Sequence, residues 1–172
     1  MKLQLLLVAL LATINLYAIT LNEKPKAVTI DGENGGLVKG GAWHSSMLKD
    51  KVYVLFYVDP DEKDVNEEFS QALKAKNYRE KGAFGSMAVV NMAATWKPDF
   101  AINILLKAKQ KEFPKTIYVK DKKSVLVKEW GLKDNASDIL IFSKDGTLLF
   151  YKPGKMSEKD TQKAFDIIEE HL

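Results

Sequence analysis

Val52-Tyr53-Val54-Leu55-Phe56-Tyr57-Val58 is an unbroken apolar run that stops at Asp59-Pro60, and no other segment says more about the fold. Both sides of the run are apolar, which predicts a strand at the centre of a sheet that is covered on both faces. Its valine and aromatic content favours a strand over a helix. Because proline cannot continue a central strand, we expect a sharp turn at Pro60.

The segment after this turn predicts an α-helix over residues 61 to about 75. Acidic residues crowd its beginning and lysines its end, as the helix dipole favours. Its apolar residues recur at helical spacing: Val65, Phe69, Ala72 and Leu73.

Further elements alternate along the rest of the chain. A second buried strand is expected at residues 87–92. A second helix should begin at Pro98 and end near Glu112, with an apolar stripe at Phe100, Ile104, Leu105 and Ala108. Short strands are predicted at residues 27–31, 116–119 and 124–127, and the glycine-rich residues 32–41 predict a turn or loose hairpin.

The C-terminal part predicts a hairpin followed by a helix. Asp145-Gly146 lies between two apolar runs, which is a strong hairpin signal. Ser157 and Asp160 have the spacing of a capping box at the start of a last helix, whose core side carries Phe165, Ile168 and Leu172. Strands and helices that alternate in this way indicate the α/β class.

The turn after the central run carries no thiol. Many exported proteins have a Cys-x-x-Cys pair at this strand-to-helix corner, whereas this chain reads Asp59-Pro60-Asp61-Glu62-Lys63-Asp64 and contains no cysteine anywhere. Disulfide exchange and catalysis by a thiolate are therefore excluded.

Residues 1–18 have the features of a secretory signal peptide. Lys2 gives a positive start, a mostly apolar run follows, and Ala18 is a small residue where cleavage would occur. The apolar run is shorter than the roughly 20 residues of a spanning helix. We therefore expect a periplasmic protein. It should have no membrane anchor after cleavage, since a lipid anchor would need a cysteine.

Charge argues against a nucleic-acid partner. The formal net charge of the 172 residues is only +3 at pH 7, and Arg79 is the single arginine. Recognition of phosphates and bases usually recruits arginine, because its planar guanidinium donates two parallel hydrogen bonds. The lysines alternate with acids, as on a solvated surface.

The chain resembles the YtfJ family of exported bacterial proteins from about residue 41 to residue 172. The similar segments are Lys51-Val52-Tyr53-Val54-Leu55, Val89-Val90-Asn91, Lys128-Glu129-Trp130-Gly131-Leu132, Ser143-Lys144-Asp145-Gly146 and Met156-Ser157-Glu158. This resemblance implies a single thioredoxin-like domain over residues 19–172, with a central mixed β-sheet flanked by helices and a C-terminal β-hairpin plus helix. It implies periplasmic location and no established activity.

A thioredoxin-like fold normally has a cis-proline in the turn before the hairpin. The corresponding position here looks like Ala136, followed by Ser137 in place of threonine. A cis bond before a residue other than proline costs about 3 kcal/mol, so we expect a trans bond at Ala136.

In that fold, the turn after the central strand and the turn before the hairpin meet at one end of the sheet. Residues 59–64 should therefore lie close to residues 135–137, where ligands of α/β proteins commonly bind. We take this corner as the candidate binding site, together with the best exposed tryptophan; its residues are Asp59, Asp61, Asp64, Asn135, Ser137 and Trp96.

Two functions of different classes fit this pattern. The first is a non-catalytic binding module that holds an envelope protein or peptide, without cofactor or resident metal. The second is a thiol-independent enzyme or divalent-metal carrier that uses the oxygen ligands of Asp59 to Asp64. Helix capping also explains these acids. Neither His44 nor His171 lies in a metal-binding pattern, and no serine lies in a nucleophile elbow.

Overall fold

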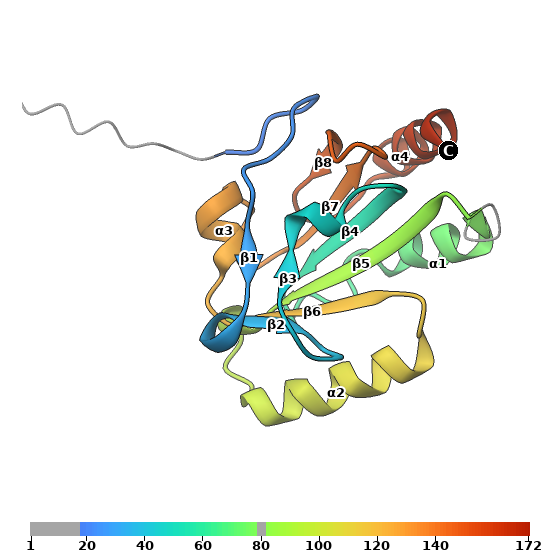
Figure 1. Cartoon of the computed structure of the whole chain (residues 1–172). Helices are drawn as coiled ribbons and strands as arrows, with labels where there is room; N and C mark the ends of the chain where they lie inside the picture. Colours follow the sequence, from blue (N-terminus) through green and yellow to red (C-terminus); the bar gives the residue numbers. More distant parts are fainter. Residues whose placement is uncertain (1–17, 79–81) are drawn as a thin grey trace, which may run out of the picture.

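The computed structural model describes residues 18–78 and 82–172, so the predicted signal segment lies outside the described residues except for Ala18. A six-stranded sheet has the order β2-β6-β5-β4-β7-β8 (Figure 1). At its centre, β4 (Val52–Val58) pairs parallel with β5 (Phe84–Asn91) and antiparallel with β7 (Ser137–Phe142). The predicted central strand and mixed sheet are both confirmed.

The remaining elements complete this order. The other strands of the main sheet are β2 (Gly35–Leu37), β6 (Ile117–Asp121) and β8 (Leu148–Lys152), and a separate pair consists of β1 (Thr29–Ile30) and β3 (Trp43–His44). The helices are α1 (Glu67–Ala75), α2 (Asp99–Glu112), α3 (Val125–Trp130) and α4 (Glu158–His171).

Helices α1, α2 and α4 cover one face of the sheet, and α3 with the β1–β3 pair covers the other (Figure 1). The side chains of β4 alternate between the two faces of the sheet. Val52 and Val54 pack with residues of α1 and α4 on one face. Leu55 and Tyr57 pack with residues of α3, β1 and β3 on the other face. This burial on both faces explains why β4 reads as a continuous apolar run.

The first helix begins later than predicted, at Glu67 instead of residue 61. The backbone N–H groups of Glu62, Val65 and Glu67 each donate to the carbonyl three residues earlier, at 3.0 to 3.2 Å. Residues 59–66 therefore form consecutive turns after Pro60. Glu62 and Asp64 lie in these turns, outside α1, whereas Glu67 and Glu68 stand in the first turn of the helix.

The predicted strand at residues 124–127 is wrong, because these residues belong to α3. Asp121, fully buried at the end of β6, accepts hydrogen bonds from the N–H groups of Val125 (2.8 Å) and Leu126 (3.1 Å). A carboxylate that satisfies the free N–H groups of a first turn stabilises a helix. This contact, between residues four and five positions apart, outweighs the strand preference of Val125 and Val127.

Helix α2 has the predicted length but buries a different stripe. Ile102, Leu106 and Gln110 face the sheet, where Ile102 and Leu106 pack against Val90 and Met92. The predicted stripe points outward instead: Phe100 is 68%, Ile104 63% and Leu105 59% exposed. Both stripes have helical spacing, so periodicity alone could not distinguish them.

At the two edges of the sheet, the observed elements are closer to those predicted from the sequence. Strands β7 and β8 form the predicted hairpin, and the capping box of Ser157 and Asp160 opens α4. The glycine-rich stretch, predicted as a turn or loose hairpin, supplies edge strand β2, which pairs antiparallel with β6. Gly35 has φ +126, and a Cβ there would lie 1.9 Å from the carbonyl oxygen of Lys120. Only glycine allows β2 this close to β6.

Candidate functional site

The two turns predicted to meet do lie together. Val58 and Ser137 are paired across β4 and β7, and the Asp59 N–H donates to the Ala136 carbonyl at 2.9 Å. No peptide bond of the described residues is cis, so the predicted trans bond at Ala136 is confirmed. We call residues 59–66 and 134–137 the corner.

Asn66 is the buried centre of the corner. Its side-chain N–H₂ donates to the carbonyl oxygens of Ser137 (2.9 Å) and Gly154 (3.0 Å), and its side-chain oxygen accepts from the Met156 N–H at 2.8 Å. One side chain thus joins the segment before α1 to the start of β7 and to the loop before α4. Sequence reasoning missed Asn66, because the helix predicted over residues 61 to 75 included it, and a lone asparagine in such a segment gives no signal of a buried hydrogen-bonding role.

Asp59 belongs to this frame and not to the exposed surface. Its side chain is only 4% exposed, and its carboxylate accepts from the Asp61 N–H at 2.8 Å. Burial is the main reason why the pKa of Asp59 is raised, and the charges of Asp61 and Glu62 raise it further. Ser137 is also buried, with Oγ 3.3 Å from the Asn66 amide nitrogen.

Asp61 connects the corner to the loop before α2. Its carboxylate accepts a hydrogen bond from the Thr95 hydroxyl at 2.7 Å and forms an ion pair with Lys97. These hydrogen bonds lower the pKa of Asp61. Trp96, between the two partners, is 86% exposed. The acidic corner and the loop that carries Trp96, which are distant in the sequence, are therefore adjacent.

Asp64 and Asn135 lie on the exposed surface of the corner. Asp64 pairs with Lys63, and Asn135 has φ +51, a left-handed conformation that asparagine tolerates well. The other tryptophans are core residues: Trp43 and Trp130 are buried and pack edge to face at 6.2 Å between ring centroids.

Asp138, next to Ser137, is a buried carboxylate with several donors. It accepts hydrogen bonds from the N–H groups of Lys133 (2.9 Å) and Gly154 (3.1 Å) and from the Tyr151 hydroxyl (3.1 Å). Burial raises its pKa, although these hydrogen bonds oppose the effect. Its donors come from two surrounding loops and from strand β8, so Asp138 holds the corner together instead of facing a substrate.

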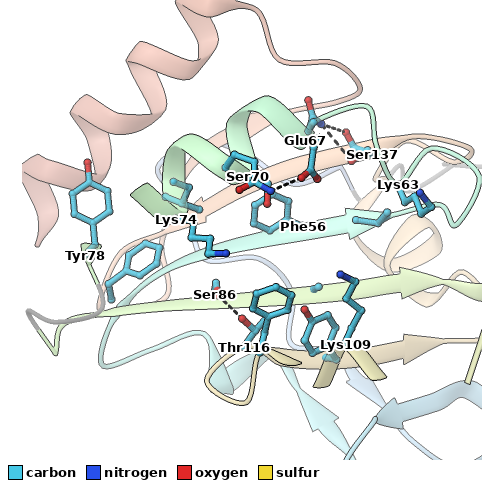
Figure 2. A pocket seen from close by; sticks show the side chains of 18 of the residues that line it. Phe56, Lys63, Glu67, Ser70, Lys74, Tyr78, Ser86, Lys109, Thr116 and Ser137 are labelled. Carbon is cyan, nitrogen blue, oxygen red and sulfur yellow. Dashed lines mark hydrogen bonds between the residues drawn. The ribbon is translucent and has the colours of Figure 1, made fainter. Parts of the chain in front are cut away.

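A groove of about 480 Å³ begins at the corner and runs between α1 and α2 over the sheet (Figure 2). Lys63, Asn66 and Ser137 of the corner line one end. Phe56 of β4 and Tyr118 of β6 contribute to the floor, and this volume lies in the range of small-molecule and peptide sites.

The groove walls are cationic and aromatic. Lys74 of α1 and Lys109 of α2 place their ammonium groups 5.5 and 5.2 Å from the ring centroid of Phe113. Ser86 and Thr116 share a hydrogen bond at 3.1 Å below them (Figure 2). Three lysines and one glutamate, Glu67, line the groove, which suits a ligand with apolar and acidic groups. The sequence signalled these residues only as scattered lysines and aromatics.

The described residues give the acidic turn no cation site. Within residues 18–78 and 82–172, no three His, Cys, Asp or Glu side chains are grouped so that they could hold a metal ion. The Asp59 carboxylate accepts a hydrogen bond from a backbone N–H, and the Asp61 carboxylate forms an ion pair with Lys97. No observation therefore favours the metal-carrier alternative.

We expect Asp59 and Asp61 to titrate on opposite sides of the usual value of 3.8. The raised pKa of Asp59 makes its contribution to folding stability largest below 3.8, and that contribution is lost as pH rises through the folded pKa. The lowered pKa of Asp61 has the opposite effect: its contribution to folding stability is present above 3.8 and is lost as pH falls through the folded pKa. Carboxyl NMR titration measures both. Lys97→Ala should raise the pKa of Asp61, and an unchanged value would contradict the ion pair.

The chain matches a family model over residues 20–171. The model is described as bacterial protein of unknown function (YtfJ_HI0045), and the match spans nearly the whole described chain. The chain belongs to the YtfJ family. An uncharacterised protein of Haemophilus influenzae is 28% identical over 130 residues, covering 73% of this chain and 70% of the relative. The uncharacterised protein YtfJ of Escherichia coli K12 is 23% identical over 133 residues, covering 76% and 72%.

Solved structures give the fold of this YtfJ family member. The exposed lipoprotein thioredoxin of Streptococcus pneumoniae superposes with a TM-score of 0.60 and 15% identity, over 84% of this chain and 99% of its own. The predicted thioredoxin-like fold is therefore confirmed. At this identity the likeness concerns the fold alone, and thiol exchange does not carry over because the chain has no cysteine.

Proposed function

We propose that this YtfJ family protein is an exported binding module of the periplasm that holds an envelope protein or peptide at the corner and the adjoining groove, without redox chemistry. The observation that carries this proposal is the groove itself, which opens at the corner where thioredoxin-like proteins carry their thiols. Here that corner is a hydrogen-bonded frame around Asn66 in a chain without cysteine.

The shape and chemistry of the groove support binding over catalysis. Its volume suits a peptide side chain or short segment, and its lysines and aromatic rings supply charge and apolar contact. The buried carboxylates of Asp59 and Asp138 accept hydrogen bonds from backbone N–H groups, which leaves neither of them as an open general base.

Export predicts a shortened chain in the cell envelope. Lys2, the short apolar run and Ala18 indicate cleavage after residue 18. The intact mass of protein from a native envelope fraction should therefore correspond to a chain that begins at or near Ile19. A full-length product in the cytoplasmic fraction would contradict the periplasmic assignment.

Reversing charge at the corner should abolish partner recovery while the fold remains. Asp61 and Asp64 are exposed residues of the corner, so Asp61→Lys with Asp64→Lys breaks the contacts of Asp61 with Thr95 and Lys97 without opening the core. We expect a melting temperature within a few degrees of the wild-type value. Crosslinking in intact cells followed by mass spectrometry should then lose the partner found with the wild-type chain.

A matched control separates this effect from net charge. Asp166→Lys with Glu170→Lys makes the same change on the exposed side of α4. This control should recover the partner as well as the wild type does. Equal recovery by the folded corner variant would remove the corner from the binding site.

A further inference from the structure

The outward side of α2 carries apolar side chains that nothing in the described chain covers. Phe100, Ile104 and Leu105 of α2, and Trp96 in the loop just before the helix, are between 59% and 86% exposed. The opposite side of the helix is used for packing, since Ile102 and Leu106 are buried against the sheet. Figure 1 shows α2 as an outer layer, with the sheet on one side only. We call the outward side of this segment the α2 face.

Lysines continue the same side toward the end of the helix. Residues 100, 104, 107, 108 and 111 are linked by steps of three or four residues, so they share one side of α2. Lys107 and Lys111 are exposed. Among residues 18–78 and 82–172, neither forms an ion pair, whereas the neighbouring Lys109 pairs with Glu112 and Lys97 with Asp61. The α2 face is therefore apolar at its N-terminal half and cationic at its C-terminal half.

We propose that the α2 face docks this protein on the surface of a membrane that contains anionic lipids. Helices that lie in the interface bury tryptophan, phenylalanine and leucine at the level of the headgroups and use lysines to bind anionic lipid. Trp96, Phe100 and Ile104 provide the apolar part, and Lys107 and Lys111 provide the charge complementarity.

A second protein fits this face less well. The cores of protein interfaces are depleted of lysine, and a stable interface takes about 20–30 residues from each side. The α2 face offers four large apolar side chains next to lysines without an ion pair. Docking is distinct from the proposed binding at the groove, although α2 also contributes Lys109 to the groove wall.

Co-sedimentation with lipid vesicles tests the proposal. The protein is used in the form in which the cell accumulates it, with its N-terminus fixed by intact mass. It should bind vesicles of phosphatidylcholine with phosphatidylglycerol and bind pure phosphatidylcholine about tenfold more weakly. Phe100→Ser with Ile104→Ser should weaken binding to the anionic vesicles at least about tenfold, because the inserted side chains are lost. Equal binding of wild type and this variant would overturn the proposal.

The lysine contribution has a matched control. Lys107→Glu with Lys111→Glu should abolish the preference for anionic vesicles. Lys159→Glu with Lys163→Glu makes the same change at the same spacing on exposed positions of α4, and it should leave vesicle binding within about twofold. If both pairs reduce binding equally, overall charge and not the α2 face attracts the protein. That result would also overturn the proposal.

Tryptophan fluorescence locates the contact. Trp96 is exposed while Trp43 and Trp130 are buried, so a blue shift on adding anionic vesicles should come from Trp96. Trp96→Phe should still bind but lose this shift. A shift that persists in Trp96→Phe would place the contact elsewhere. Light scattering tests for a second copy of the chain at this face. If the wild type were a dimer and bound no vesicles, and if Phe100→Ser with Ile104→Ser made it a monomer, the α2 face would be a dimer interface instead.

Discussion

Replacing Trp43 with alanine is expected to lower the free energy of unfolding by about 4 kcal/mol, because a large, fully buried aromatic side chain leaves a cavity that neighbouring residues fill poorly. Trp43 is 0% exposed, donates its indole N–H to the Met87 sulfur at 3.0 Å, and packs on Trp130. Urea denaturation followed by circular dichroism measures the change.

The same substitution at an exposed tryptophan is the control. Trp96→Ala removes a side chain that is 86% exposed, so it should change the free energy of unfolding by less than about 0.5 kcal/mol. A similar loss for both variants would show that the burial of Trp43 against Met87 and Trp130 does not stabilise the fold.

Replacing Asn66 with alanine is expected to cost about 3 kcal/mol, because it leaves buried backbone groups without hydrogen-bond partners. The carbonyls of Ser137 and Gly154 and the N–H of Met156 all lose the partner that Asn66 provides. Hydrogen exchange should show added opening at Met156, and urea denaturation gives the total loss.

Gln71→Ala on α1 is the comparison for this loss. Gln71 is exposed, and its side chain donates a hydrogen bond to Glu67 at 2.5 Å on the helix surface, so its removal should cost less than about 0.5 kcal/mol. If Asn66→Ala were equally mild, the corner would not depend on a buried asparagine, and its frame would need another explanation.

Local sequence signals were sufficient where each element has a distinctive pattern. The apolar run of β4, the Asp145-Gly146 turn and the capping box at Ser157 were all found in place. They are readable because burial on two faces, left-handed turn geometry and cap hydrogen bonds each require particular residue types at fixed spacing.

The errors arose where contacts of particular side chains in the folded chain decide the outcome. Helix α3 forms because the buried carboxylate of Asp121, four residues before Val125, accepts hydrogen bonds from its first N–H groups. The choice between the two stripes of α2 depends on Val90 and Met92 of another segment. The candidate site shows the same limit. The contact between the two turns was predicted from the family resemblance, but the role of Asn66 and the groove come from side chains that meet only in the folded chain.

A photoreactive amino acid placed at Gln71 in the groove tests the central claim most directly. Irradiated in the native host, the protein should form a discrete adduct with one envelope protein or peptide, because Gln71 lines the groove and is exposed. The same amino acid at Glu33, an exposed position outside the groove, should give no such adduct. Absence of an adduct at Gln71, or the same products from both positions, would contradict a binding role for the groove.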